Sequence, residues 1–305
     1  MKNRMRKLVA LLAVSTMTLS MLAACGGNKE AAAPAAAEPA QATEEAAPAE
    51  EAAPVEETAE ATTDDNTLPR NETLYFAGQQ WGAVNSWNPI GTNQNNSMAI
   101  AGNASGYRTL MFETLYMFNF MDGTMQPLLA DGDYSWNDDM TELTVKIKSA
   151  AKWSDGTPVT ANDVAATYAI GLEIGNGTGT GNQAYIDTIE AADDATVVIK
   201  SKLTDDGKPV NPLKLLDFLT GTPIAQAAWI DTVKTRCNGD ATAILNDPGE
   251  DVVWSGPYTK YFADDQKVVL VRDDNYWGQD ASMWGSLPVP KYIAHTIYAD
   301  NAAGE

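Results

Sequence analysis

A run of amides and tryptophans near residue 80 contains the side chains best suited to ligand chemistry in this sequence. Ten consecutive positions supply Gln79, Gln80, Trp81, Asn85, Trp87 and Asn88. A tryptophan face can stack on a pyranose ring, and amides can meet sugar hydroxyls as both donors and acceptors. We therefore predict that these six residues line a ligand-binding cleft. The alternative is that the tryptophans pack in a core and the amides only stabilise turns.

The elements that must position these residues are a mixture of strands and helices. A β-rich strand at 72–78 precedes the amide-rich loop, and ligands of open α/β sheets bind beyond the carboxyl ends of strands. Further strands are expected at 142–148, 195–200, 268–272 and 292–298, and helices near 107–117, 164–172, 212–219 and 222–233. This mixture predicts an α/β or mixed α+β fold class.

Local signals mark several turns and helix ends. Thr160 lies three residues before Asp163, which predicts a variant of the capping box at the start of the 164–172 helix. Asp-Gly pairs at 122–123 and 155–156 predict turns. The glycine-rich stretch 175–181 lacks the Lys of a phosphate-binding loop, so we expect a flexible surface loop there.

Composition excludes several functions. The chain of 305 residues carries a formal net charge of −21, which would repel a nucleic-acid backbone, so no nucleic-acid partner is expected. One His and two Cys cannot form a zinc site of thiolates and imidazoles, and no metal or other cofactor is expected. The sequence offers no recognisable pairing of a nucleophile with a base, so we predict that the protein is not an enzyme.

The first 68 residues have the composition of a targeting segment followed by a tether. Residues 1–24 have four basic residues, no acid and a short apolar run, as in a signal peptide, and the string ending at Cys25 resembles the lipobox of bacterial lipoproteins. Residues 25–68 would then be a lipidated Cys25 and a disordered tether rich in Ala, Glu and Pro. We expect an exported protein anchored to the outer face of the cytoplasmic membrane, at the cell surface or in a periplasm.

Two motifs in the remaining residues, 69–305, resemble those of one bacterial family. The first runs from Pro127-Leu-Leu-Ala through Trp136 and the 143–148 strand to Lys152-Trp-Ser-Asp-Gly-Thr-Pro-Val-Thr-Ala-Asn-Asp-Val. The second comprises Trp254-Ser-Gly-Pro-Tyr, the 267–272 strand and Asn275-Tyr-Trp-Gly. Together they resemble extracellular solute-binding family 5, the oligopeptide, dipeptide, nickel and oligosaccharide receptors of ABC importers. The second motif departs from the family pattern at Trp254, Ser255 and Asp273.

The resemblance implies a fold and a function. The fold would be of the periplasmic-binding-protein type II, and residues 69–305 would be a truncated first lobe, since family members usually exceed 500 residues. The function would be capture of an oligosaccharide or oligopeptide by lobe closure and its delivery to an ABC importer permease. The Gly-Gln-Gln-Trp-Gly run at 78–82 resembles the oligosaccharide branch and slightly favours a sugar. A monomer is expected, and a secreted glycan-binding adhesin or hydrolase is the alternative.

Overall fold

The computed structural model describes residues 68–76, 84–92 and 110–296. The chain divides into two units, Met1–Asp65 and Asn66–Glu305, and all described residues belong to the second. The predicted signal peptide, Cys25 and nearly all of the tether therefore lie outside the described residues.

The first of two main sheets, here the β9 sheet, has the strand order β1-β10-β9-β8. Its strands are β1 (Thr73–Phe76), β8 (Tyr258–Ala263), β9 (Lys267–Arg272) and β10 (Tyr292–Thr296). Strand β1 pairs parallel with β10, and the other pairs are antiparallel. The strands predicted near 72–78, 268–272 and 292–298 are confirmed where the structure describes them, whereas β8 was not predicted.

The second main sheet, here the β5 sheet, is antiparallel throughout, with the order β4-β5-β7-β6. Its strands are β4 (Ser135–Trp136), β5 (Glu142–Lys146), β6 (Ile186–Asp193) and β7 (Thr196–Ser201). In β5, Leu143 and Val145 are fully buried while the two end residues are exposed, as the predicted alternation requires. A separate hairpin of β2 (Tyr116–Asn119) and β3 (Thr124–Pro127) turns at Gly123, whose φ of 71° suits glycine.

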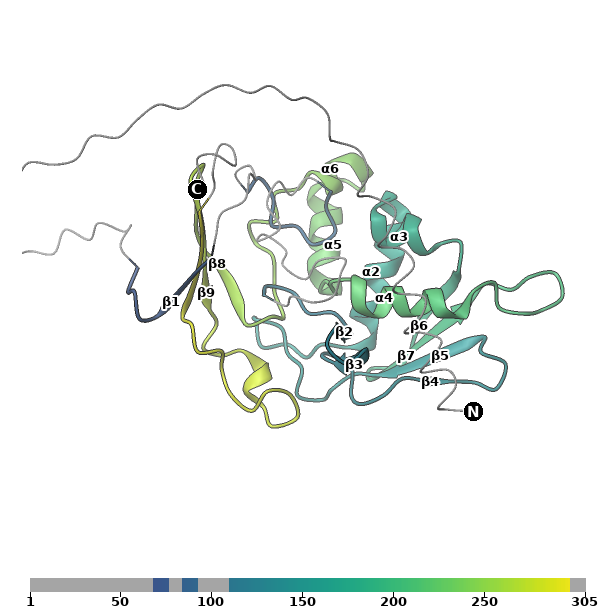
Figure 1. Cartoon of the computed structure of the whole chain (residues 1–305). Coiled ribbons are helices and arrows are strands. Elements are labelled where there is room, and N and C mark those ends of the chain that lie inside the picture. Colours follow the sequence, from purple (N-terminus) through teal and green to yellow (C-terminus); the bar gives the residue numbers. More distant parts are fainter. Residues whose placement is uncertain (1–67, 77–83, 93–109, 297–305) are drawn as a thin grey trace, which may run out of the picture. The chain divides into compact units, whose positions relative to one another are not determined.

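Helices lie between and beside the two sheets (Figure 1). They are α2 (Ala161–Ile174), α3 (Gly177–Asn182), α4 (Leu215–Gly221), α5 (Ala227–Arg236) and α6 (Ala241–Leu245), with short 3₁₀ turns η2 (Pro212–Lys214) and η3 (Trp277–Gln279). The predicted capping box at the start of α2 is present, because the Thr160 N–H donates to Asp163 Oδ2 at 2.8 Å. The predicted helix at 212–219 is confirmed. That at 222–233 begins only at Ala227.

The expectation of a flexible loop at 175–181 is wrong, because these residues form most of α3. The Asn176 side chain accepts a hydrogen bond from Gly179 N at 3.1 Å and caps the short helix. A Cβ atom at Gly179 would lie 2.2 Å from the Gly171 carbonyl oxygen of α2. The glycines therefore allow α3 to lie directly against α2, which a sequence pattern read locally does not reveal.

The predicted helix near 107–117 is also wrong over its described part. Residues 110–115 are irregular, and the following residues enter β2. The Leu110 and Met111 carbonyl oxygens accept hydrogen bonds from Tyr258 N and Gly256 N, both at 2.9 Å, and not from residues four positions later. Apolar spacing typical of a helix arises here because Met111, Phe112 and Leu115 are fully buried between the two sheets.

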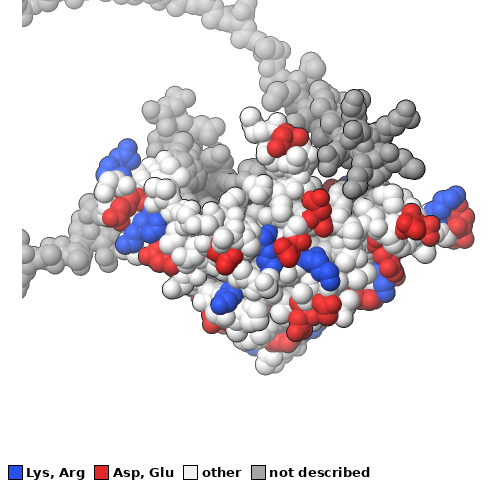
Figure 2. Space-filling model, turned by 90° about the horizontal axis from the view of Figure 1, so that it is seen from below, with Lys and Arg blue, Asp and Glu red and all other residues white. Residues whose placement is uncertain are grey.

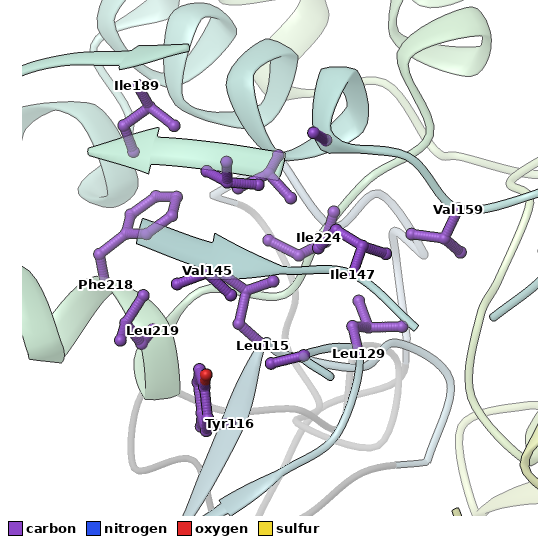
Figure 3. Close-up of a cluster of buried hydrophobic side chains, with 14 of the residues drawn as sticks. Leu115, Tyr116, Leu129, Val145, Ile147, Val159, Ile189, Phe218, Leu219 and Ile224 are labelled. Carbon is purple, nitrogen blue, oxygen red and sulfur yellow. The ribbon is translucent and has the colours of Figure 1, made fainter. Parts of the chain in front are cut away.

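Two hydrophobic cores stabilise this arrangement. The core of the β5 sheet gathers Leu115, Val145, Ile147 and Phe218 with other apolar side chains (Figure 3). The core of the β9 sheet gathers residues of β8, β9, β10 and α5. Helix α2 contributes to both cores, so it joins the two sheets. No described helix combines the length and apolar character that a bilayer span needs.

Candidate functional site

The first sequence motif forms a tight loop at residues 152–158. Lys152 and Pro158 form an isolated antiparallel bridge, and the predicted turn between them has Gly156 at a φ of 84°. The Asp155 carboxylate accepts from Thr157 N at 2.9 Å and from the Gln226 side chain at 2.8 Å. Burial alone would raise the pKa of Asp155, but these hydrogen bonds outweigh it and hold the pKa below its usual value.

Asp163 fixes this loop to two helices. Its Oδ2 accepts from Thr160 N at 2.8 Å and from the Trp153 indole N–H at 3.2 Å, and its Oδ1 accepts from Ala227 N at 2.8 Å. The carboxylate thus lies at the N-termini of both α2 and α5, where a negative charge is favourable. Trp153 is 3% exposed and packs in the core of the β5 sheet.

The second sequence motif joins the first through reciprocal backbone and side-chain contacts. Ser154 N donates to the Trp254 carbonyl oxygen at 2.8 Å, and Trp254 N donates to Ser154 Oγ at 3.2 Å. The Trp254 indole N–H donates to Asp273 Oδ2 at 3.2 Å. Two of the positions at which the second motif departs from the family pattern are therefore bonded to each other.

A small pocket of about 70 Å³ opens where the two motifs meet. Its lining comprises Lys152, Trp153, Ser154, Gly156, Trp254, Ser255, Gly256, Asp273, Asn275, Tyr276 and Trp277. Lys152 and Asn275 are exposed, and the Trp254 ring is half-buried. The pocket offers an aromatic face beside a cation, a carboxylate and an amide. It has room for ordered water or for one polar group of a larger ligand.

The predicted cleft residues are placed only in part. Gln79, Gln80 and Trp81 lie outside the described residues, and Asn85 is exposed. Trp87 is 5% exposed and packs in the core of the β9 sheet, and Asn88 is fully buried. Trp87 thus packs in a core, and the buried Asn88 side chain is hydrogen-bonded within the protein. Contact of the six residues with a ligand stays a prediction.

The segment 84–92 is held by the chain that follows α6. Asn88 Nδ2 donates to the Ile244 carbonyl oxygen at 2.8 Å, and Ser86 Oγ donates to the Asp247 carbonyl oxygen at 2.7 Å. Arg236 forms a bidentate pair with the Asp247 carboxylate, with Nε 2.7 Å from Oδ2 and Nη2 2.5 Å from Oδ1. This pairing fixes the connection that in turn fixes Ser86 and Asn88.

One buried carboxyl at the meeting point of the motifs was not expected from the sequence. Glu113 is fully buried, and its Oε1 accepts a short hydrogen bond from the Tyr276 hydroxyl. Its backbone N–H donates to Ser255 Oγ at 3.0 Å. Burial raises the pKa of Glu113 to about 8, although Tyr276, Trp277 and Lys148 act in the opposite direction. An acid within an apolar run gives no local signal of this role.

In the described ranges, no group of three or more His, Cys, Asp or Glu side chains could hold a metal ion. On one face of the molecule, acidic and basic side chains are interspersed (Figure 2).

Residues 124–303 match the model of the bacterial extracellular solute-binding proteins, family 5, middle region. The chain belongs to this family. A probable peptide-binding protein of Agrobacterium fabrum, YejA, is 28% identical over 174 residues, and the periplasmic oligopeptide-binding protein OppA of Escherichia coli is 30% identical over 188 residues. These alignments cover 57% and 55% of this chain but only 27% and 31% of the relatives.

Solved structures of family-like receptors share the fold. An oligopeptide-binding protein of Thermotoga maritima, solved with mannohexaose, is 24% identical with a TM-score of 0.63, over 77% of this chain and 39% of that one. AppA of Bacillus subtilis, solved with a nonapeptide, is 17% identical with a TM-score of 0.54, over 74% and 39%. The predicted fold class is confirmed, and the described unit corresponds to part of a periplasmic binding protein.

Proposed function

We propose that this family 5 protein is an extracytoplasmic receptor that captures an oligosaccharide or oligopeptide by lobe closure and delivers it to an ABC importer. The observation that carries the proposal is the convergence of both family motifs on one pocket, through the Ser154 and Trp254 hydrogen bonds. The relatives named above are binding proteins, which favours capture without turnover. Lobe closure is a common way for such receptors to enclose a solute.

We propose an oligosaccharide as the slightly preferred ligand. Tryptophan faces beside amides and carboxylates suit pyranose rings, and the described part of the chain offers this combination at Trp254, Asp273 and Asn275. Gln79, Gln80 and Trp81 would extend it. The peptide-binding relatives support the opposite choice, so the ligand class needs a direct measurement.

Isothermal titration of the full-length protein would decide between the ligand classes. The titrants are cello-, xylo-, malto- and manno-oligosaccharides and, separately, a mixture of tri- to pentapeptides. We expect saturable binding of at least one sugar series, with no reducing ends released on prolonged incubation. Heat with peptides alone would reverse the ligand preference. Turnover of a chromogenic glycan or peptide would overturn the receptor function.

A lipid anchor on Cys25 is the second part of the proposal. Labelling cells with an alkyne fatty acid should tag the protein and place it in the membrane fraction. Cys25→Ala should abolish both results. Cys237→Ser is the matched control, since Cys237 is the other cysteine and follows the C-terminal end of α5. Labelling that survives Cys25→Ala would refute the anchor.

A further inference from the structure

The Glu113 carboxyl joins segments that are far apart in the sequence. Its side chain meets the Tyr276 hydroxyl, its N–H meets Ser255 Oγ, and its carbonyl oxygen accepts from Ile224 N at 3.0 Å. Tyr276 and Ser255 both line the pocket between the motifs. Glu113 therefore lies where the segments 110–115, 253–257 and 273–277 are fastened together.

The carboxyl is poorly equipped to hold a negative charge. Within the described residues, Glu113 Oε2 is buried and accepts no hydrogen bond. The nearby Trp277 indole N–H donates instead to the Ser255 carbonyl oxygen at 2.9 Å. An ionised carboxylate has about four acceptor sites, and leaving them empty in an apolar interior is costly.

The charged and titratable groups around Glu113 do not compensate for this. Lys148, two residues after the end of β5, is the cation whose charge reaches Glu113, but its Nζ donates to the Leu128 and Ala130 carbonyl oxygens. From the 273–277 segment the titratable group that meets Glu113 is Tyr276, a neutral donor. Asp273 accepts from the Trp254 indole N–H, and Asp274 pairs with Arg272. The contacts from the other two segments, Ser255 and Ile224, carry no charge.

We propose that Glu113 is a proton-dependent fastener, meaning a carboxyl group that holds two chain segments together in its neutral form. In its neutral form the carboxyl holds the 273–277 segment against the 110–115 segment. Loss of the proton leaves a buried charge with Oε2 unpaired, which favours opening of these segments to water and loosens the pocket wall formed by Tyr276 and Trp277, although the Tyr276 hydroxyl then donates to a stronger acceptor. The device would make the pocket sensitive to alkaline pH whatever ligand the protein binds.

The direction of the pH effect follows from the raised pKa, about 8 in the folded protein against an ordinary 4.5. Below 4.5 the group is protonated in both states, so its contribution to stability does not change with pH. Between 4.5 and 8 only the unfolded chain releases the proton, so Glu113 makes folding progressively less favourable as the pH rises. Above 8 both states are ionised, and the effect levels off.

Chemical denaturation of the full chain at pH 5 and pH 8 tests the fastener. The folded-to-unfolded ratio of the wild type should fall by about two to three powers of ten relative to Glu113→Gln, which keeps an acceptor for Tyr276 but cannot ionise. Glu142→Gln, an exposed site on β5, is the matched control and should follow the wild type. If the free energy of unfolding changed equally between pH 5 and pH 8 in wild type and Glu113→Gln, the proposal would be overturned.

Two further measurements on the wild type keep the proposal testable if Glu113→Gln does not fold. The ¹³C resonance of the Glu113 carboxyl should titrate near pH 8, and a midpoint below about pH 6 would refute the fastener. Hydrogen exchange, corrected for the chemical rate, should accelerate at least about tenfold between pH 6 and pH 9 for the amides of Glu113, Ser255 and Gly256. Amides of α2 that exchange through global unfolding should accelerate as well, because the same proton sets the overall stability, and unchanged exchange of both sets would also refute the proposal.

Discussion

Two buried carboxyl groups in this protein have opposite surroundings. Asp163 is 5% exposed, and its two oxygens receive N–H donors from Thr160, Trp153 and Ala227. Glu113 is fully buried, its Oε1 accepts from the Tyr276 hydroxyl, and its Oε2 accepts no hydrogen bond among the described residues. Asp163 lies at two helix N-termini, whereas Glu113 lies in an irregular segment that presents no aligned N–H groups.

The difference shows that burial does not decide what a carboxyl does in a core. A carboxylate surrounded by donors is a structural anion that organises its neighbours. A carboxyl without them is favoured in the neutral form and becomes sensitive to pH. The same fold therefore contains one buried carboxyl group surrounded by N–H donors and one that largely lacks them. The predictions below test this contrast.

Removing the Asp163 side chain should have the largest effect. In Asp163→Ala the N–H groups of Thr160 and Ala227 and the Trp153 indole lose their acceptor, and each buried donor left unpaired costs about 1–3 kcal/mol. We expect the free energy of unfolding to fall by about 3 kcal/mol or more in urea titrations at pH 7. Asp187→Ala, at an exposed position on β6, is the control.

Asp163→Asn should recover part of this loss, since one acceptor oxygen remains. A loss below about 1 kcal/mol in Asp163→Ala would mean that water replaces the carboxylate, and the contrast with Glu113 would lose its basis.

Arg236→Ala tests Asp247, a buried carboxylate whose main donor is a cation. Burial alone would raise the pKa of Asp247, but hydrogen bonds from Arg236 and Gly249 N hold it below its usual value. Without Arg236 the 7%-exposed Asp247 loses its counter-ion, and we expect a loss of about 2 kcal/mol at pH 7. The contribution of Asp247 is present above its ordinary pKa of 3.8 and is lost as the pH falls through the folded value.

The difference in free energy of unfolding between wild type and Arg236→Ala should therefore become smaller below about pH 3.8. Arg236→Lys keeps the charge but not the bidentate geometry and should lie between them. If this difference in free energy did not change with pH, Arg236→Ala would destabilise the protein through lost packing and not through a lost ion pair.

The sequence predicted the capping role of Asp163 but no role for Glu113, because only the first has a local signal. Thr160 and Asp163 are three residues apart, and a capping box needs only that spacing. The second task of Asp163, at Ala227 of α5, depends on how two helices pack and has no local signal. The same limit explains α3, whose glycines suggested a loop until the contact of Gly179 with Gly171 was known.

The candidate site shows the same division. The Asp-Gly turn at 155–156 and the strands that flank the motifs follow local rules, and the structure has them. Glu113 lies in a segment whose apolar spacing predicted a helix, and an acid on a helix would face solvent. Tertiary hydrogen bonds, among them those of Leu110 and Met111 with residues 256–258, hold that segment in an irregular conformation in which Glu113 is buried beside Tyr276.

Tyr276→Phe should sharpen the contrast at a smaller scale. It removes the hydroxyl that donates to Glu113, with a loss of about 1 kcal/mol at pH 6. This hydrogen bond lowers the raised pKa of Glu113, so the loss should grow above pH 8, where the carboxyl is ionised. Urea titrations at pH 6 and pH 9 measure both values.

Tyr258→Phe is the matched control for Tyr276→Phe. The Tyr258 hydroxyl donates to the Pro290 carbonyl oxygen at 2.7 Å, a partner that does not titrate. Burial raises the pKa of Tyr258 to about 12, so its loss should be the same at pH 6 and pH 9. If the loss in free energy of unfolding changed with pH to the same extent in both variants, the effect of Tyr276→Phe would not depend on the ionisation of Glu113.

Glu173→Gln should have the smallest effect, and it isolates what burial adds. Like Asp163, Glu173 belongs to α2 and bonds to α5, here through Lys234 Nζ at 2.6 Å. Both side chains are more than a third exposed, so water competes with the pair and salt screens it. We expect a loss of about 0.5 kcal/mol or less, vanishing in 0.5 M NaCl. A loss comparable with that of Asp163→Ala would show that the contact between α2 and α5, and not the donors around a buried charge, sets the energy.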